Sequence, residues 1–404
     1  MKILQINKYH FIKGGADSVF FNTMELLKNH GHQVIPFSIK HSKNLPSPYE
    51  KYFVDAPEIR ELPLTEKLKS IGRFFYDKNA AKKLEMLILQ EKPDIAHLHN
   101  IFNGISLSIL PVLYKYKIPI VITLHDTRLI CPSSYFSLRG KKCDSCLRRG
   151  GINCGLYKCY QDSLFNSWMC AMEMFFKEKI FHYDQYIGKY IFVSNRYKYT
   201  HSLRHEFFEK KGTVLYNFIP NIEGIKTVDK KGKYLFYYGR VTIEKGIKTL
   251  VEVMKDLPDY QLKIAGTGNL MEELQAMNLP NVEFLGFRSG NELFDTLKNS
   301  AFVIVPSEWE ENNPMTVIES YAYGKPVIGS RIGGIPEIID EGKTGFTFEA
   351  FSKDNLKRAI TEAMAVSDDQ YKVMSEKARL FANNNFNPEI HYNHLIEIYK
   401  SLLR

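Results

Sequence analysis

The sequence predicts an α/β protein whose two Rossmann-like, doubly wound domains face each other across a cleft. Three observations support this. Short apolar runs alternate with segments of helical period, they do so in two sets, and a polar stretch at 221–233 separates the sets. The length of 404 residues exceeds one ordinary core. With 44% apolar and 25% charged residues and no repeat, solenoid, collagen-like and largely disordered proteins are excluded.

The first set of elements predicts an N-terminal domain over residues 1–220. Its strands are expected at 3–6, 33–39, 94–98 and 119–124, and a helix at 16–29. The second set predicts a domain over 221–386, with strands at 234–238, 261–265, 282–285, 302–305 and 326–329. The last segment, 387–404, contains a helix at 390–403 that is apolar on one face, which we expect to cross back to the N-terminal domain.

The net charge and the lengths of the apolar runs predict where in the cell the protein is found. The charge of +9 permits anionic partners without choosing among them. No apolar run is long enough to span a membrane and residues 1–7 form a strand pattern, so we expect a cytoplasmic protein. The stretch 66–78 mixes cations with aromatic residues, which suits peripheral contact with the inner face of the membrane. An ordinary amphipathic surface helix is the simpler interpretation of that stretch.

The strongest clue to function is the segment 307–320. Asn313 suits an N-cap and Pro314 the first helical position, so we expect a helix to begin there. The amide N–H groups of Met315 and Thr316 would then be unpaired at the helix tip. Such a tip attracts anions, phosphate groups in particular.

Two carboxylates accompany this helix tip. Glu311 lies just outside the helix and Glu319 inside it, where both have reach for sugar or ribose hydroxyls. The arrangement suits a sugar joined to a nucleoside diphosphate. Ordinary solvated acids on a surface helix are the alternative interpretation.

Two cations follow the first strand of the second set. Arg240 comes just after the strand, and Lys245 is expected at the start of the next helix. A planar guanidinium and a compact ammonium together can neutralise the charge on a departing nucleoside diphosphate. Taken singly, each is more often a solvated surface cation.

Glycines mark further turns beside strands. Gly14 and Gly15 lie between the first strand and the first helix, where they let the backbone approach a phosphate or a sugar. The third glycine of a dinucleotide fingerprint is missing, which disfavours a nicotinamide enzyme. Gly266 opens another turn, and Phe287 follows the next strand, in a position to flank a nucleobase.

Histidines end the strands of the first domain. His125 and Asp126 follow the strand 119–124 on the cleft side, where His125 would donate to a sugar hydroxyl or to a developing charge. A neutral core histidine beside a turn-capping aspartate is the alternative. Taking His97 and His99 to alternate along a strand, we expect at most one of them to face the cleft and assign both a structural role.

Together these segments resemble the GT-B-fold retaining glycosyltransferases of family 4, also described as glycosyl transferases group 1. The matching pieces are Gly14-Gly15, His125-Asp126, Gly239-Arg240, Glu244-Lys245-Gly246, Glu311 and Glu319 seven residues apart, Gly324-Lys325-Pro326-Val327 and Gly333-Gly334. Many relatives have Gly-Phe after the first glutamate, where this chain has Asn312-Asn313, so the identity of the donor sugar stays open.

The resemblance implies roles for these residues. Arg240 and Lys245 would hold the donor diphosphate and Glu319 the ribose. Glu311 and the backbone after it would hold the donor sugar, which His125 contacts from the other domain, so Glu311 and His125 are the expected catalytic residues. The acceptor hydroxyl would attack on the face from which the diphosphate leaves, so that the anomeric configuration is retained without an enzymic nucleophile. No cofactor is required for that chemistry.

The implied substrates are a UDP- or GDP-sugar and a glycan or lipid-linked glycan acceptor, in the assembly of cell-envelope polysaccharide. A nucleotide-sugar epimerase of related fold is the alternative enzyme. A zinc-knuckle nucleic-acid-binding protein is the alternative from another class, and the dispersed cations disfavour it.

All six cysteines fall in a Cys-rich insertion at 131–170. The spacing of Cys143 with Cys146 and of Cys154 with Cys159 is typical of ligand pairs, and a reducing cytoplasm favours zinc over disulfides. We therefore expect a structural zinc knuckle on the acceptor side of the cleft, with free thiols packed in a loop as an equal alternative.

Overall fold

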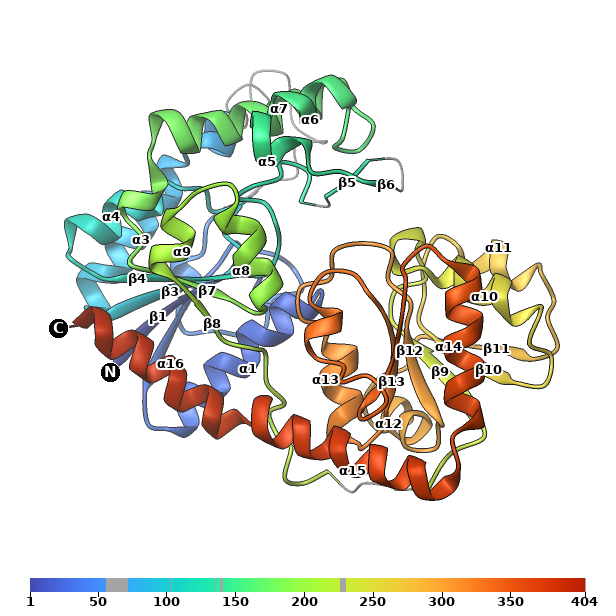
Figure 1. Ribbon diagram of the computed structural model, residues 1–404. Helices are drawn as coiled ribbons and strands as arrows, with labels where there is room; N and C mark the ends of the chain where they lie inside the picture. Colours follow the sequence, from blue (N-terminus) through green and yellow to red (C-terminus); the bar gives the residue numbers. More distant parts are fainter. Residues whose placement is uncertain (56–71, 103, 135, 139–140, 226–229, 404) are drawn as a thin grey trace.

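The computed structural model describes residues 1–55, 72–102, 104–134, 136–138, 141–225 and 230–403 (Figure 1). It has two lobes, each built on a parallel six-stranded sheet with helices packed on it. The predicted α/β fold with two doubly wound sheets is confirmed. Of the stretch 66–78, interpreted as either an amphipathic surface helix or a membrane contact, residues 66–71 lie outside the described residues, and residues 72–75 are helical.

The first lobe contains a sheet of strand order β2-β1-β3-β4-β7-β8. Its strands are β1 (Lys2–Ile6), β2 (Gln33–Phe37), β3 (Ile95–Leu98), β4 (Ile120–Leu124), β7 (Lys189–Phe192) and β8 (Gly212–Val214). The helices around it are α1 (Gly15–Asn29), α3 (Lys78–Glu91), α4 (Ile109–Lys115), α8 (Asn195–Ser202) and α9 (Phe207–Lys211), with short turns η1 (Glu50–Tyr52) and η4 (Tyr183–Gln185). The central strands are buried on both faces, which explains their continuous apolar runs.

The second lobe repeats this plan with the strand order β11-β10-β9-β12-β13-β14. Its strands are β9 (Tyr234–Tyr238), β10 (Gln261–Ala265), β11 (Val282–Gly286), β12 (Phe302–Val305), β13 (Val327–Ser330) and β14 (Gly345–Phe348). Its helices are α10 (Ile247–Met254), α11 (Met271–Gln275), α12 (Gly290–Lys298), α13 (Met315–Ala322) and α14 (Lys353–Ala365), with short turns η5 (Ile243–Lys245) and η6 (Ile335–Glu337).

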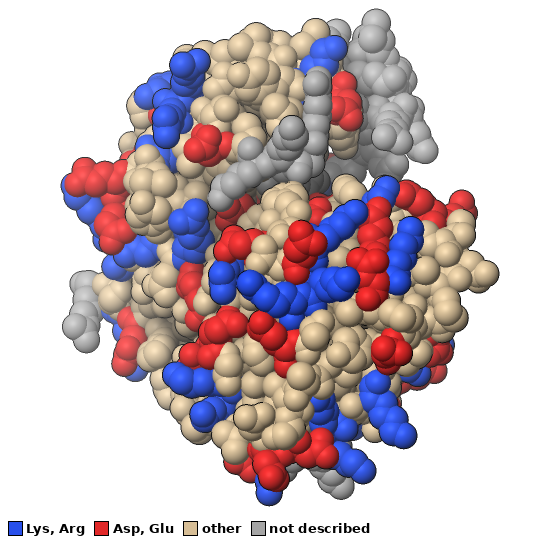
Figure 2. Space-filling model, turned by 45° about the vertical axis from the view of Figure 1, so that its right-hand side comes forward, with Lys and Arg blue, Asp and Glu red and all other residues tan. Residues whose placement is uncertain are grey.

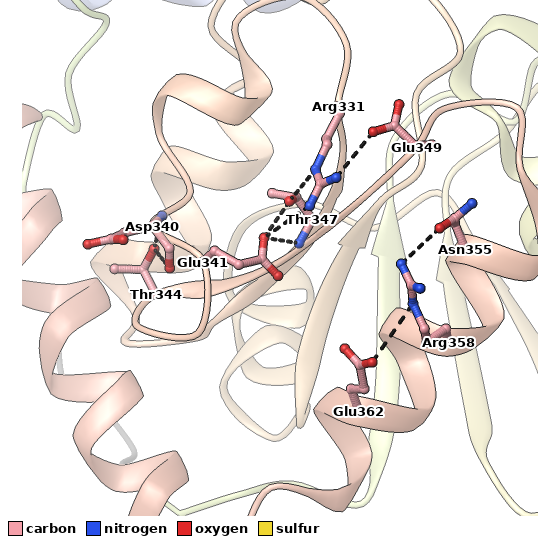
Figure 3. A network of polar contacts seen from close by, with 9 residues as sticks. All are labelled: Arg331, Asp340, Glu341, Thr344, Thr347, Glu349, Asn355, Arg358 and Glu362. Carbon is pink, nitrogen blue, oxygen red and sulfur yellow. Dashed lines mark hydrogen bonds and ion pairs between the residues drawn. The ribbon is translucent and has the colours of Figure 1, made fainter.

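A polar network fixes the edge strand β14 of the second lobe (Figure 3). Arg331, just after β13, donates from Nε to Thr347 Oγ1 at 2.8 Å and pairs with Glu349 at 3.1 Å. Glu341 accepts from the Thr347 amide at 2.9 Å. These contacts bind the carboxyl end of the edge strand β14 to the segment that follows β13.

Residues 125–188, here called the β4–β7 segment, leave the first sheet and return to it. They form β5 (Ser137–Leu138), β6 (Lys141–Lys142), α5 (Ser145–Arg149), α6 (Ile152–Tyr157), α7 (Leu164–Phe175) and a π-helical turn η3 (Phe176–Ile180). A buried ion pair of 2.6 Å joins Arg128 to Glu173, and Lys177 Nζ donates to the Arg128 carbonyl at 2.6 Å. Burial lowers the pKa of Lys177 to about 8. The segment is therefore anchored two residues beyond Asp126.

The last two helices, α15 (Asp368–Asn385) and α16 (Pro388–Leu403), run along the base of Figure 1 from the second lobe to the first. Leu395, Ile396 and Tyr399 of α16 share a buried cluster with Ile3 and Phe20. The end of the chain therefore completes the core around its beginning. Among the described residues, no helix combines the length and the apolar character needed to cross a bilayer.

Candidate active site

The carboxyl ends of the second sheet gather several of the predicted residues. Arg240 follows β9, Gly266 follows β10 and Phe287 follows β11, and these three strands are neighbours. The Gly266 amide donates to the Gly286 carbonyl at 2.8 Å, so the turns are in contact. A Cβ at Gly266 would lie 1.8 Å from the Gly239 carbonyl oxygen, so packing of backbone on backbone requires this glycine. Phe287 is 71% exposed.

A charged pair forms the centre of this edge. Lys245 Nζ lies 2.5 Å from Glu311 Oε1, which also accepts from Ser307 Oγ at 2.7 Å. Burial acts to raise the pKa of Glu311, but the contacts with Lys245 and Ser307 outweigh it and hold the pKa below its usual value. Lys245 ends the turn η5, and α10 begins only at Ile247, so the expectation that Lys245 starts the helix is wrong.

An indole ring that the sequence did not single out lies against both cations. Lys245 Nζ is 5.5 Å and Arg240 Cζ 5.9 Å from the centre of the Trp309 ring. The Arg240 side chain is 59% exposed and pairs with Glu244 at 3.4 Å. The fork of Arg240 is thus available to solvent, whereas the ammonium of Lys245 is positioned within the site.

Helix α13 begins one residue later than predicted. Pro314 is its N-cap, with φ −67° and ψ 121°, and Met315 is its first residue. Asn313 was expected to be the cap, but its Oδ1 accepts instead from the Asn217 amide at 2.9 Å. Within the described structure, the amides of Met315 and Thr316 have no hydrogen-bond acceptor, so the helix tip presents free donors.

Glu319 lies one turn inside α13 beside an aromatic hydroxyl. Tyr238 OH is 3.1 Å from Glu319 Oε2 and 3.0 Å from the Thr316 carbonyl. Burial raises the pKa of Glu319 to about 7. This carboxyl group therefore changes its charge near neutral pH.

His125, at the end of β4 in the first lobe, belongs to a buried hydrogen-bonded chain. His125 Nε2 lies 2.9 Å from His99 Nδ1, and His99 Nε2 lies 3.1 Å from Gln5 Oε1. The amide oxygen of Gln5 accepts only, so His99 donates from Nε2 and, when neutral, accepts at Nδ1. His125 then donates from Nε2, which leaves its Nδ1 as an acceptor.

The protonation of His125 follows from its surroundings. Desolvation lowers its pKa to about 4, so the ring is neutral at physiological pH. No described side chain bonds to Nδ1. The neutral ring, and the Asp126 Oδ1 that accepts from the Arg128 amide at 2.8 Å, match the alternative interpretation of a neutral histidine beside a turn-capping aspartate, and a contact of His125 with a sugar stays a prediction.

The expectation that His97 and His99 alternate along the strand is wrong, whereas the burial of both rings agrees with the structural role expected for them. Side chains two residues apart share one face of a strand, and the two rings stack with centres 4.4 Å apart. His97 Nδ1 is 2.7 Å from Tyr399 OH and its Nε2 is 2.7 Å from Thr123 Oγ1. The chain beneath His125 thus extends to helix α16.

The Asn312-Asn313 pair joins the two lobes. Asn312 Nδ2 donates to the Leu124 carbonyl at 3.0 Å, directly before His125, and its Oδ1 accepts from Ser194 at 3.3 Å. A Cβ on Gly333 would meet the Glu311 carbonyl at 2.1 Å. The matched Gly333-Gly334 segment therefore packs on the loop that carries Glu311.

Gly14 and Gly15 stand at the start of α1 with open space where a Cβ would project. Asp17 accepts from the Gly14 amide at 3.1 Å and caps the helix. Nearby, a cavity of about 190 Å³ is lined partly by Asp17, Lys8 and Asp126. This cavity provides polar groups of both charges beside Asp126, the residue that follows His125.

The cysteines of the β4–β7 segment are free thiols. A thiol–thiol hydrogen bond lowers the pKa of Cys159 and raises that of Cys154, and burial raises the pKa of Cys146 to about 12. In the described part of the chain, no three His, Cys, Asp or Glu side chains converge as ligands. The arrangement of Cys143, Cys146, Cys154 and Cys159 gives the zinc prediction no support.

Two protein families match the chain in series. Residues 13–154 match the family described as Glycosyltransferase Family 4, and residues 218–381 match Glycosyl transferases group 1. An uncharacterised glycosyltransferase of Methanocaldococcus jannaschii is 25% identical over 388 residues, which cover 95% of this chain and 93% of the relative. The lipopolysaccharide 1,2-N-acetylglucosaminetransferase of Salmonella typhimurium is 31% identical over 162 residues, 36% of this chain and 42% of that protein.

A solved structure has the same architecture. The crystal structure of Anabaena HepE in complex with UDP-glucose aligns with a TM-score of 0.64 and 16% identity over 99% of this chain and 100% of that one. The likeness extends over both lobes, so the fold is GT-B.

Proposed function

We propose a function from the premise that this chain belongs to glycosyltransferase family 4, the glycosyl transferases group 1. It moves a sugar from a nucleotide-diphosphate sugar to a glycan or lipid-linked glycan, with retention of configuration, in the assembly of envelope polysaccharide. The observation that carries this proposal is the grouping of Lys245, Glu311 and the free amides of α13 at one sheet edge. His125 lies on the other side of the crevice.

The donor diphosphate fits the positive groups of the second lobe. Lys245 has three N–H donors, so it can keep Glu311 and still donate to a phosphate oxygen. The exposed Arg240 fork and the amides of Met315 and Thr316 supply further donors. Glu319 accepts from ribose hydroxyls, and Glu311 from hydroxyls of the donor sugar.

Transfer then needs no protein nucleophile. The acceptor oxygen bonds to the anomeric carbon on the face from which the diphosphate departs. The bond between the anomeric carbon and the phosphate oxygen breaks, and its electron pair goes to the diphosphate. The acceptor proton passes to the departing phosphate oxygen. Lys245 and the α13 tip stabilise the charge that builds there, and His125 Nδ1 accepts from a sugar hydroxyl.

Thermal denaturation with a panel of nucleotide sugars tests the donor site. We expect one uridine- or guanosine-based donor to raise the melting temperature, and Arg240→Ala or Lys245→Ala to abolish the rise. Lys248→Ala is the matched control, because Lys248 pairs with Glu273 at 2.6 Å outside the site. Equal stabilisation by every nucleotide, unchanged in the two site variants, would contradict the proposal.

Product analysis tests the reaction class. With an acceptor present, proton NMR of the product is expected to show the anomeric configuration of the donor. Donor converted to an epimer without acceptor would indicate the alternative, a nucleotide-sugar epimerase. On the face shown in Figure 2, basic and acidic side chains are interspersed, which disfavours the nucleic-acid-binding alternative. Membrane contact by residues 66–78 stays a prediction.

A further inference from the structure

The β4–β7 segment carries a concentration of exposed apolar side chains. Nine large ones lie within 29 residues of helices α6, α7 and η3, which together form what we call the apolar face. They are Ile152, Leu156, Tyr157, Leu164, Phe165, Trp168, Met172, Phe175 and Ile180. Phe165 is 63% and Phe175 61% exposed. Single exposed apolar residues are ordinary, but a contiguous face of this kind marks an interaction surface.

The face is built by a helix hairpin. On α7 the exposed residues recur at helical spacing, while the opposite side, with Cys170 and Met174, is buried. A Cβ at Gly155 would lie 2.6 Å from the Trp168 ring, so the indole rests directly on the α6 backbone. The hairpin thus holds its apolar side chains outward on a fixed frame at the upper end of Figure 1.

Unpaired cations border the apolar face. Arg148 and Arg149 of α5 and Lys179 of η3 line a hollow of about 340 Å³ together with Ile152 and Phe175. Within the described residues none of these three cations has a carboxylate partner. The acid in the same hollow, Glu178, is already engaged by Arg204 at 2.6 Å and His205 at 3.1 Å. The hollow is therefore a positively charged pocket whose wall is apolar.

We propose that the apolar face docks on an anionic phospholipid bilayer. Phe165, Trp168 and Phe175 enter the headgroup and acyl boundary, and the hollow of Arg148, Arg149 and Lys179 receives lipid phosphates. A second copy of the chain fits less well, because a symmetric pairing of this face would bring the same unpaired cations together. None of the side chains named for this surface belongs to residues 66–78, although Phe75 contacts Phe176 of η3 with ring centres 5.8 Å apart. Docking would place the β4–β7 segment, which is anchored beside Asp126, at the lipid surface.

Flotation of the full-length protein with phosphatidylcholine vesicles, with and without phosphatidylglycerol, tests the docking surface. We expect binding that depends on phosphatidylglycerol. Phe165→Gln/Phe175→Gln is expected to lower the partition coefficient at least about tenfold. We expect the partition coefficient to fall about fivefold for each cation removed in the triple variant Arg148→Gln/Arg149→Gln/Lys179→Gln. All of these side chains are exposed, so the melting temperatures should stay unchanged.

Matched controls lie on the other lobe. Val373→Gln/Leu380→Gln removes two exposed apolar side chains of α15, and Lys255→Gln/Lys372→Gln/Lys377→Gln removes three cations. Both control variants are expected to bind like the parent. The chain has two tryptophans, so a Trp309→Phe background reports Trp168 alone, and its emission should shift to the blue on anionic vesicles.

Three results would overturn the proposal. The first is equal vesicle binding by the apolar-face variant and its control. The second is binding that phosphatidylglycerol does not increase. The third is a dimer by light scattering that the apolar-face variant dissociates, with no vesicle binding by the parent. None of these readouts depends on transferase activity, so they are independent of the proposed reaction.

Discussion

The second lobe presents charge to the crevice, whereas the first lobe presents a neutral ring. Lys245, Glu311 and the tip of α13 lie within one short stretch of sheet edge and act through charge. His125 is neutral and is oriented by His99 and Gln5, which come from two other strands. The charged side is therefore built from residues that lie close together at one sheet edge. On the neutral side, the orientation of His125 depends on side chains from several strands of the first lobe.

The largest effect should come from the charged side. Lys245→Met removes the ammonium next to the departing diphosphate, so kcat/KM should fall about 10²- to 10³-fold. It also leaves Glu311 buried without its partner, which should cost about 3 kcal/mol in the free energy of unfolding. Steady-state kinetics and denaturant titration measure the two effects, with Lys248→Met as the control cation.

The double variant Lys245→Met/Glu311→Gln separates these effects. It removes the unpaired charge, so stability should return while activity stays low. If activity returned as well, Lys245 would stabilise the fold without contributing to catalysis. The second lobe would then not act through the charge of Lys245.

A smaller effect is expected from the neutral side. His99→Leu removes the acceptor that fixes the His125 tautomer, so kcat should fall about 10- to 100-fold. NMR of the imidazole nitrogens should show a proton on His125 Nε2 in the parent and mixed tautomers in the variant. Tyr399→Phe, two hydrogen bonds further away, should change kcat much less. Equal losses in His99→Leu and Tyr399→Phe would contradict an ordered chain.

The two sides should also differ in pH dependence. Glu319 has a raised pKa of about 7, so its carboxylate is present above that pH and is lost below it. Affinity for the nucleotide sugar should therefore rise about tenfold between pH 6 and 8 and then level off. Calorimetry measures this dependence, which Glu319→Gln should flatten. His125, with a pKa of about 4, should contribute nothing over that range.

The smallest expected effect concerns the contact between the lobes. Asn313→Ala leaves the amide of Asn217 without its acceptor, which should cost about 1–2 kcal/mol. Thermal unfolding measures the loss. Asn355→Ala, on exposed hydrogen bonds of α14, is the control. An unchanged melting temperature in Asn313→Ala would mean that water replaces the contact.

Local patterns predicted one side of the site better than the other. Strands such as β1, β4, β9 and β12 are continuous apolar runs, and the sequence located them. Strands β7, β8 and β14 are short and were missed, because polar residues begin or interrupt them. The donor-side residues follow strands that are neighbours, so adjacency in the sheet could be predicted.

The first-lobe network could not be predicted in this way. His125 depends on residues 5, 97, 99 and 399, which only the folded chain brings together. The pair His97 and His99, two residues apart on one strand, was the available signal. Asn313 was misassigned as a cap because a local capping rule does not see Asn217.

The crossing of α16 has a consequence for biosynthesis. Leu395 and Tyr399 leave the ribosome long after Ile3, yet they fill the cluster around it. The first lobe therefore waits, with part of its apolar surface uncovered, until α16 has been synthesised. Deleting α16 should expose that surface and promote aggregation of an otherwise intact chain.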